Sequence, residues 1–136
     1  MWYEYLVFFI LLAIPIAMSW RYLPLRIPVD SDGHYKNCES PIERRLYLAL
    51  QQNGYQIETQ TRCGPYRIDI TIPRARIAIE ADGKAYHSSP AQKANDRRKN
   101  AYLRENGWKV LRFSGRQIYK EMPKILRKIE DAMTER

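Results

Sequence analysis

A β-hairpin rich in isoleucine, folded about a turn at Arg74-Ala75, constrains this chain more than any other stretch. Pairing the two strands about that turn places Asp69 directly opposite Glu80, and directly opposed residues of an antiparallel pair point to the same face. Asp82 follows Glu80 by two residues and therefore shares that face. Three carboxylates on one face repel each other unless a cation lies between them, and a hard divalent cation with oxygen ligands is the natural candidate. The hairpin therefore predicts a metal-dependent enzyme that acts on a phosphodiester.

The opposite face of the hairpin is predicted to be core. Ile68, Ile70 and Ile72 alternate along the first strand, so they point away from the carboxylates. Ile77 and Ile79 continue this apolar face on the second strand. Without the first 35 or so residues, the chain is close to the commonest domain size, about 100 residues, which allows one modest core.

Helix and strand signals predict an α/β sandwich. Ser40-Pro41 and Ser89-Pro90 each combine a capping serine with proline at the first helical position. A strand–helix–strand crossover makes the last two strands parallel, so the sheet is mixed. The predicted order is a helix from Ser40-Pro41 to Asn53-Gly54, strands over 55–62, 66–73 and 76–82, a helix from Ser89 to Asn106-Gly107, a strand over 108–113, a helical turn within 114–122 and a helix over 123–133.

The charge of the chain favours a polyanionic partner. The formal net charge is +8, and the excess is concentrated between Ser89 and Lys128, where Lys and Arg far outnumber Asp and Glu. Such an excess on a folded domain suits nucleic acid first and anionic lipid second, although solvated basic helix faces would give the same composition. The predicted phosphate contacts are Arg97, Arg98, Lys99, Arg112 and Arg116.

The two cysteines, Cys38 and Cys63, do not form a disulfide framework or a Cys-x-x-Cys pair. We interpret them as reduced thiols of minor structural importance. A zinc site that combines both with His34 and His87 is the alternative.

Residues 1–20 contain an apolar segment bracketed by Trp2 and Trp20. As a helix it would extend about 28 Å, close to the roughly 30 Å of a bilayer core, with aromatic residues at both interfaces. We predict a transmembrane anchor over 1–20, contact with the lipid bilayer through 2–20 and a linker over 21–38. Because basic residues follow the segment, the predicted localisation is a single-pass membrane protein with its domain in the cytoplasm. A cleaved signal peptide, or a hydrophobic helix packed on a partner, is the alternative.

A set of motifs across residues 39–133 resembles the PD-(D/E)XK nuclease superfamily, and most closely the very-short-patch-repair endonucleases with their uncharacterised endonuclease-related cousins. The motifs are Asp69, Glu80-Ala-Asp82-Gly83, His87, Asp96 and the strand Gly107-Trp-Lys-Val-Leu-Arg-Phe113. The resemblance implies a restriction-endonuclease-like α/β sandwich, with a central mixed sheet flanked by helices, over residues 39–136. It also implies Mg²⁺-dependent cleavage of DNA, with Mn²⁺ as a substitute.

The resemblance implies metal ligands and catalytic residues as well. Asp69 and Glu80 match the acidic residues that bind the metal, and Asp82 joins them on the sheet face. Asp82 stands where the superfamily usually has a lysine two residues after the acid. The cysteine-rich zinc motif of the repair enzymes is absent.

Three further residues complete the predicted catalytic set. His87 matches a residue that activates water or steadies the phosphate. Glu43, on the first helix, matches a glutamate that completes the metal site through water, although the helix cap already explains it. Lys84 is the alternative catalytic lysine.

The predicted function is a membrane-anchored, metal-dependent endonuclease that hydrolyses phosphodiester bonds of DNA. Two other classes stay open: a non-catalytic nucleic-acid-binding module of the same fold, and a scaffold whose basic face binds anionic lipid. Metal-dependent cleavage distinguishes the enzyme from both. A homodimer is compatible with the enzyme, because cutting both strands needs two sites or two visits.

Overall fold

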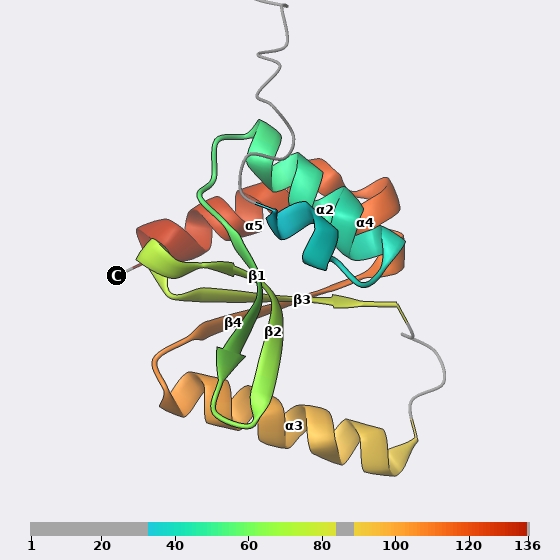
Figure 1. Ribbon diagram of the computed structural model, residues 1–136, viewed down its shortest axis with the longest axis vertical. Helices are drawn as coiled ribbons and strands as arrows, with labels where there is room; N and C mark the ends of the chain where they lie inside the picture. Colours follow the sequence, from blue (N-terminus) through green and yellow to red (C-terminus); the bar gives the residue numbers. More distant parts are fainter. Residues whose placement is uncertain (1–32, 84–88, 136) are drawn as a thin grey trace, which may run out of the picture.

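The computed structural model describes residues 33–83 and 89–135, which form one four-stranded sheet with helices on both faces (Figure 1). The strands follow one another across the sheet in chain order. The elements are η1 (His34–Asn37), α2 (Pro41–Gln52), β1 (Glu58–Cys63), β2 (Tyr66–Ile72), η2 (Pro73–Ala75), β3 (Ile77–Asp82), α3 (Pro90–Glu105), β4 (Lys109–Ser114), α4 (Gly115–Lys120) and α5 (Met122–Thr134).

The sheet is mixed, as the sequence predicts. β1, β2 and β3 are antiparallel to one another, whereas β4 is parallel to β3. In Figure 1, α2, α4 and α5 cover one face of the sheet and α3 covers the other. This arrangement confirms the predicted α/β sandwich.

The helices begin where the capping signals place them. Ser40 precedes α2, and its side chain accepts a hydrogen bond from the Glu43 amide. Ser89 precedes α3 and forms a reciprocal capping box with Gln92. Each cap satisfies amide donors that lack partners in the first turn of a helix, and proline at the next position needs no such partner.

The hairpin has the predicted register but a different turn. Ile72 pairs with Ile77, which preserves the predicted alignment of the two strands. The turn is the 3-10 helix η2 followed by Arg76 in the left-handed region at φ 53°, rather than two residues. The Arg76 guanidinium lies over the Trp108 ring, 4.4 Å from its centroid, and Nη2 donates to the Asn106 carbonyl. These tertiary contacts stabilise a backbone conformation that a local sequence signal does not reveal.

The β1–β2 hairpin bends toward α3, and this corrects the predicted core face. Gln60 on β1 has a φ of 55°, and the β2–β3 ladder ends at Ile70. Beyond this point Ile68 packs in a small cluster with Leu103 of α3 instead of continuing the face of Ile70. The prediction that Ile68 shares that face is therefore wrong, because the bend turns its side chain toward the other layer.

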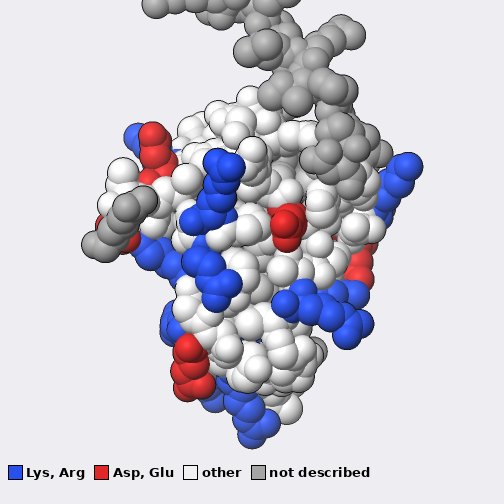
Figure 2. Space-filling view, turned by 60° about the vertical axis from the view of Figure 1, so that its left-hand side comes forward, with Lys and Arg blue, Asp and Glu red and all other residues white. Residues whose placement is uncertain are grey.

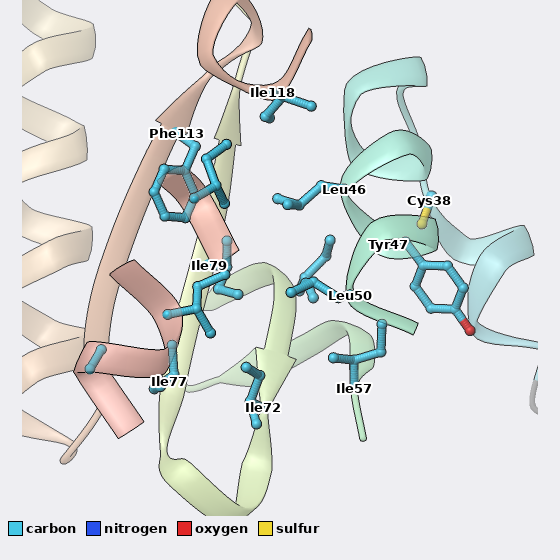
Figure 3. Close-up of a cluster of buried hydrophobic side chains, with 14 residues drawn as sticks. Cys38, Leu46, Tyr47, Leu50, Ile57, Ile72, Ile77, Ile79, Phe113 and Ile118 are labelled. Carbon is cyan, nitrogen blue, oxygen red and sulfur yellow. The ribbon is translucent and has the colours of Figure 1, made fainter. Parts of the chain in front are cut away.

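The main core lies between the sheet and α2, α4 and α5. Figure 3 shows Ile77, Ile79 and Phe113 of the strands facing Leu46 and Leu50 of α2. All five are buried. The predicted apolar face of the hairpin is therefore confirmed for Ile77 and Ile79 of β3. The carboxylates lie on the opposite face of the sheet.

Part of the predicted linker packs against the sheet. Within residues 33–38, η1 contacts β1, and the Thr59 hydroxyl donates to the His34 carbonyl at 2.8 Å. Cys38 is buried in the main core as a free thiol. The sequence contains no periodic signal for this contact.

The predicted membrane localisation needs correction. The apolar segment 2–20 falls outside the described residues. Within residues 33–83 and 89–135, no helix is long and apolar enough to cross a bilayer. The longest, α3, has 16 residues and is strongly charged, whereas a span needs about 20 apolar residues. This finding contradicts the predicted single-pass localisation.

Candidate active site

Asp69 and Glu80 lie where β2 and β3 separate. The last ladder pair on this side is Ile70 with Ile79, so the continued register places the two carboxylates opposite each other. Asp69 Oδ2 accepts a hydrogen bond from the Ala81 amide at 2.9 Å. The side chain of Asp69 therefore replaces a backbone acceptor at the point where the strands part.

Glu80 is buried and Asp69 is half-buried. Burial raises the pKa of Asp69, although the hydrogen bond from Ala81 acts in the opposite direction. Burial, and then the charge of Asp69, raise the pKa of Glu80 to about 6 against the lowering effect of Lys99. Because the charge of Asp69 raises the pKa of Glu80, a cation placed between the two carboxylates would stabilise their charged forms.

Lys99 of α3 lies at this carboxylate pair. Its Nζ is 2.6 Å from Glu80 Oε2, and its side chain is only 19% exposed. The sequence predicts Lys99 as a phosphate contact, but the structure shows it in an ion pair with Glu80. A signal existed: Asp96, Lys99 and Leu103 follow helical spacing, so charged residues extend the face that Leu103 buries.

The second oxygen of Glu80 fits a metal ligand. Glu80 Oε1 is buried and has no hydrogen-bond partner among the described residues. A buried carboxylate oxygen without a donor is costly, and a hard cation would satisfy it. Asp69 and Glu80 alone are two ligands; within residues 33–83 and 89–135, no group of three or more His, Cys, Asp or Glu side chains is placed to hold a metal ion.

Asp82 lies two residues after Glu80 on β3 and forms an ion pair with Arg112. Arg112 Nη2 of β4 is 3.4 Å from Asp82 Oδ2 and 3.2 Å from Asp96 Oδ2 of α3. The parallel ladder places Arg112 beside Glu80, which brings its guanidinium to this edge of the sheet. Arg112, a predicted phosphate contact, thus bridges two carboxylates. The role of Asp82 as a metal ligand stays a prediction.

Glu43 is buried at the start of α2, close enough to Asp69 to raise its pKa. Its oxygens accept from the Ser40 hydroxyl at 2.7 Å, the Glu39 amide at 2.9 Å and Gln60 Nε2 at 3.2 Å. The helix cap and Gln60 account for these contacts. Gln60 was not predicted, because its position depends on the bend of β1, and its Oε1 is a second buried acceptor without a partner in the described chain.

The remaining predicted residues divide into two groups. His87 and Lys84 fall within 84–88, outside the described residues, so their roles stay predictions. Arg97, Arg98 and Arg116 are exposed on α3 and α4. Figure 2 shows Lys and Arg side chains spread over another face, the one on the left of Figure 1, so positive charge alone does not identify a binding surface.

The zinc alternative gains no support from its described members. His34 Nδ1 accepts from the Thr59 amide at 3.4 Å, whereas Cys38 is buried in the main core. No group of three such ligands forms within the described ranges.

Pockets lie at several places on the part of the chain that the structure describes. One of about 370 Å³ lies beside the carboxylate edge, between Glu43, Asp82, Asp96 and Arg112. A larger one of about 570 Å³ lies at the opposite end of the hairpin, beside Pro73. A third, of about 610 Å³, lies beside Arg45 of α2 and Tyr119 of α4. The two larger pockets contain none of the predicted site residues, so the smallest of the three is the better candidate for substrate.

Comparison with known families agrees with this fold. The family profile REase_MTES_1575, which is restriction-endonuclease-like, matches residues 42–133. The chain belongs to the REase_MTES_1575 family. This match extends from the second residue of α2 to the penultimate residue of α5, and the range contains both Asp69 and Glu80.

Two bacterial relatives of this REase_MTES_1575 protein have no assigned activity. The uncharacterized protein YcjD of Escherichia coli (strain K12) is 30% identical over 79 residues, which cover 56% of this chain and 65% of that protein. The chain thus spans about two thirds of that relative. An uncharacterized protein of Haemophilus influenzae is 24% identical over 94 residues, covering 67% of this chain and 77% of that protein.

A solved structure supports the fold. The catalytic domain of the homing endonuclease I-Bth0305I matches with a TM-score of 0.58 and 20% identity, covering 68% of this chain and 93% of that domain. Together with the family profile, this match confirms the predicted PD-(D/E)XK-like nuclease fold. The closer resemblance to very-short-patch-repair endonucleases is not tested by these matches and stays a prediction.

Proposed function

We propose that this protein is a metal-dependent endonuclease that hydrolyses phosphodiester bonds of DNA. The observation that carries the proposal is the pair Asp69 and Glu80, two carboxylates that lie opposite each other where β2 and β3 separate. One oxygen of Glu80 is buried and has no donor among the described residues. The restriction-endonuclease-like family and fold supply the context.

In this proposal Asp69 and Glu80 hold a divalent cation, Mg²⁺ or Mn²⁺. When bound, the cation would polarise the scissile phosphate and make water a better nucleophile. The hydrogen bond from the Ala81 amide fixes Asp69 Oδ2, which leaves its other oxygen for the cation. The partial burial of the pair strengthens its attraction to a cation, because charges interact more strongly where water is less abundant.

Exposed basic residues orient the DNA in this proposal. Arg97 and Arg98 extend from α3, on the sheet face that carries the carboxylates, and Arg116 lies on α4. Their charges would neutralise backbone phosphates without reading the bases. Cleavage is therefore expected to show little sequence preference.

A non-catalytic DNA-binding module of the same fold is the second candidate. The ion pair between Lys99 and Glu80 favours it, since an ammonium already neutralises one carboxylate. The limited ligand set within residues 33–83 and 89–135 favours it as well. This candidate predicts DNA binding without turnover.

The test uses the full chain with supercoiled plasmid and Mg²⁺, Mn²⁺ or EDTA. We expect nicking with either metal and none in EDTA. Glu80→Gln should abolish nicking, because it removes a charged ligand but keeps the shape of the side chain. The matched control is Glu105→Gln, the same change at an exposed position of α3, which should cut like the wild type.

Two results would count against the enzyme. Equal nicking by Glu80→Gln would reject this site. Folded wild-type protein that binds DNA in a gel-shift assay, yet does not cut it with any metal, would establish the binding module instead.

A further inference from the structure

The inner face of α3 changes from apolar to charged where it passes the carboxylate pair. Leu103 is fully buried against the sheet. Lys99 lies one helical turn before Leu103, and its Nζ donates a hydrogen bond to Glu80 Oε2. The packing of Leu103 therefore fixes the helix so that the Lys99 side chain reaches Glu80 from the opposite layer. The ion pair between Lys99 and Glu80 is therefore one of the contacts that hold α3 against the sheet.

Within the described chain, Lys99 is the cation in direct contact with the pair. Glu80 has one oxygen on the Lys99 ammonium and the other buried without a partner. Asp69 lies opposite and adds a second negative charge. A divalent cation bound to these carboxylates would therefore compete with the ammonium for the same negative charge.

Arg112 is less suited to this task. Its guanidinium is already shared between Asp82 and Asp96, at 3.4 and 3.2 Å. A guanidinium held by two carboxylates has a fixed orientation, whereas lysine is a compact charge on a flexible stem. Lys99 can therefore change partner by rotating its side chain, without movement of α3.

We propose that Lys99 is an exchangeable counterion: it neutralises Glu80 before the metal binds, and it transfers to an oxygen of the bound phosphodiester once the metal has taken Glu80. This inference rests on the proposed function, because it assumes a metal and a phosphodiester at this site. It assigns Lys99 two successive partners, where the sequence predicts only a phosphate contact.

The experiment compares Lys99→Met with the wild type by titrating the full chain with Mn²⁺ in a calorimeter, without DNA. Removing the competing ammonium should tighten Mn²⁺ binding about tenfold, the scale expected for one unit charge beside a metal site. With saturating Mn²⁺, plasmid nicking by the same variant should fall about 100-fold, because a donor to the phosphate is lost. The matched control is Lys93→Met on the exposed face of α3, which should change neither quantity.

Tighter metal binding together with slower cleavage separates this role from a structural one. A lysine that only held α3 in place would leave a looser site and weaker Mn²⁺ binding. Unchanged or weaker binding by folded Lys99→Met would overturn the proposal. If Lys99→Met does not fold, as judged by circular dichroism, Lys99→Gln keeps a hydrogen-bond donor for Glu80 and must show the same tightening.

The two proposals fail in different ways. If the wild type binds Mn²⁺ through Glu80 but never cuts, the endonuclease is rejected while the binding comparison still decides the role of Lys99. If the wild type cuts but Lys99→Met binds Mn²⁺ as the wild type does, only the counterion is rejected. A wild type that binds no Mn²⁺ rejects both.

Discussion

Glu80 experiences opposing influences from its surroundings. The ammonium of Lys99 stabilises its charged form, whereas burial and the charge of Asp69 favour the protonated form. Burial and Asp69 have the larger effect, since the pKa rises from 4.5 to about 6. The native chain therefore binds this proton more tightly than the unfolded chain does.

This imbalance predicts how the stability of the metal-free protein depends on pH. The contribution of Glu80 is present below the unfolded pKa of 4.5 and is lost as the pH rises through about 6. The loss is about 2 kcal/mol at most, from 1.36 kcal/mol per pKa unit. Glu80→Gln lacks this titration, so its free energy of unfolding relative to the wild type should increase between pH 4.5 and 7.

Urea unfolding in EDTA at several pH values measures this difference. Glu105→Gln, on the exposed end of α3, serves as the control and should follow the wild type throughout. A difference that stays constant with pH, or shrinks as the pH rises, would contradict the burial of an ionised Glu80.

Sequence reasoning was most accurate for residues whose neighbours are local. The opposition of Asp69 and Glu80 follows from strand register, because residues on a strand alternate between the two faces. Lys99 was predicted as a phosphate contact, and its ion pair with Glu80 was not foreseen, since helical spacing indicates which face of α3 meets the sheet but not which sheet residue lies opposite. Its partner lies 19 residues away, on another element.

At the scale of elements, Asp69 has a structural role as well as the proposed role in metal binding, because it lies where β2 and β3 separate. Its Oδ2 accepts from the Ala81 amide, which would otherwise lack a strand partner at this position. Asp69→Ala should leave that amide unsatisfied and lower the free energy of unfolding by about 1–3 kcal/mol. Asp69→Asn keeps an acceptor and removes a buried charge, so it should be at least as stable as the wild type.

The two variants differ in stability but not in cleavage. Urea unfolding should separate them, while both should fail to nick plasmid. If Asp69→Ala were as stable as Asp69→Asn, the hydrogen bond from the Ala81 amide would contribute nothing to the free energy of unfolding.

The elements themselves were largely predictable, and the exceptions share a cause. Capping serines and prolines placed the starts of α2 and α3, because these signals act within one turn. The bend at Gln60 and the position of η1 were missed. Both depend on contacts with distant strands and helices, which no local pattern records.

For the whole molecule, net charge predicts a polyanion but not the face that binds it. Basic side chains occur on several faces, as Figure 2 shows for one of them. The two sheet faces differ in a more useful way: one packs the main core against α2, α4 and α5, and the other carries the carboxylates under α3. The binding face should therefore be the side of α3.

Salt dependence tests this assignment. Replacing Arg97 and Arg98 with glutamine should reduce the slope of log affinity against log salt by about 2, at roughly 0.9 per phosphate contact. The matched control replaces Arg127 and Lys128, exposed on α5, with glutamine and removes the same charge. Fluorescence anisotropy with a duplex in EDTA measures both, and equal slopes for the two double variants would reject α3 as the binding side.

The crossover from β3 through α3 to β4 determines when the carboxylate site can be completed during synthesis. Asp69 and Glu80 leave the ribosome first, but Lys99 and Arg112 belong to elements that emerge later. Until α3 and β4 dock, the carboxylates have neither their counterion nor the strand beside β3. The complete site therefore assembles only when the last third of the sequence has been synthesised.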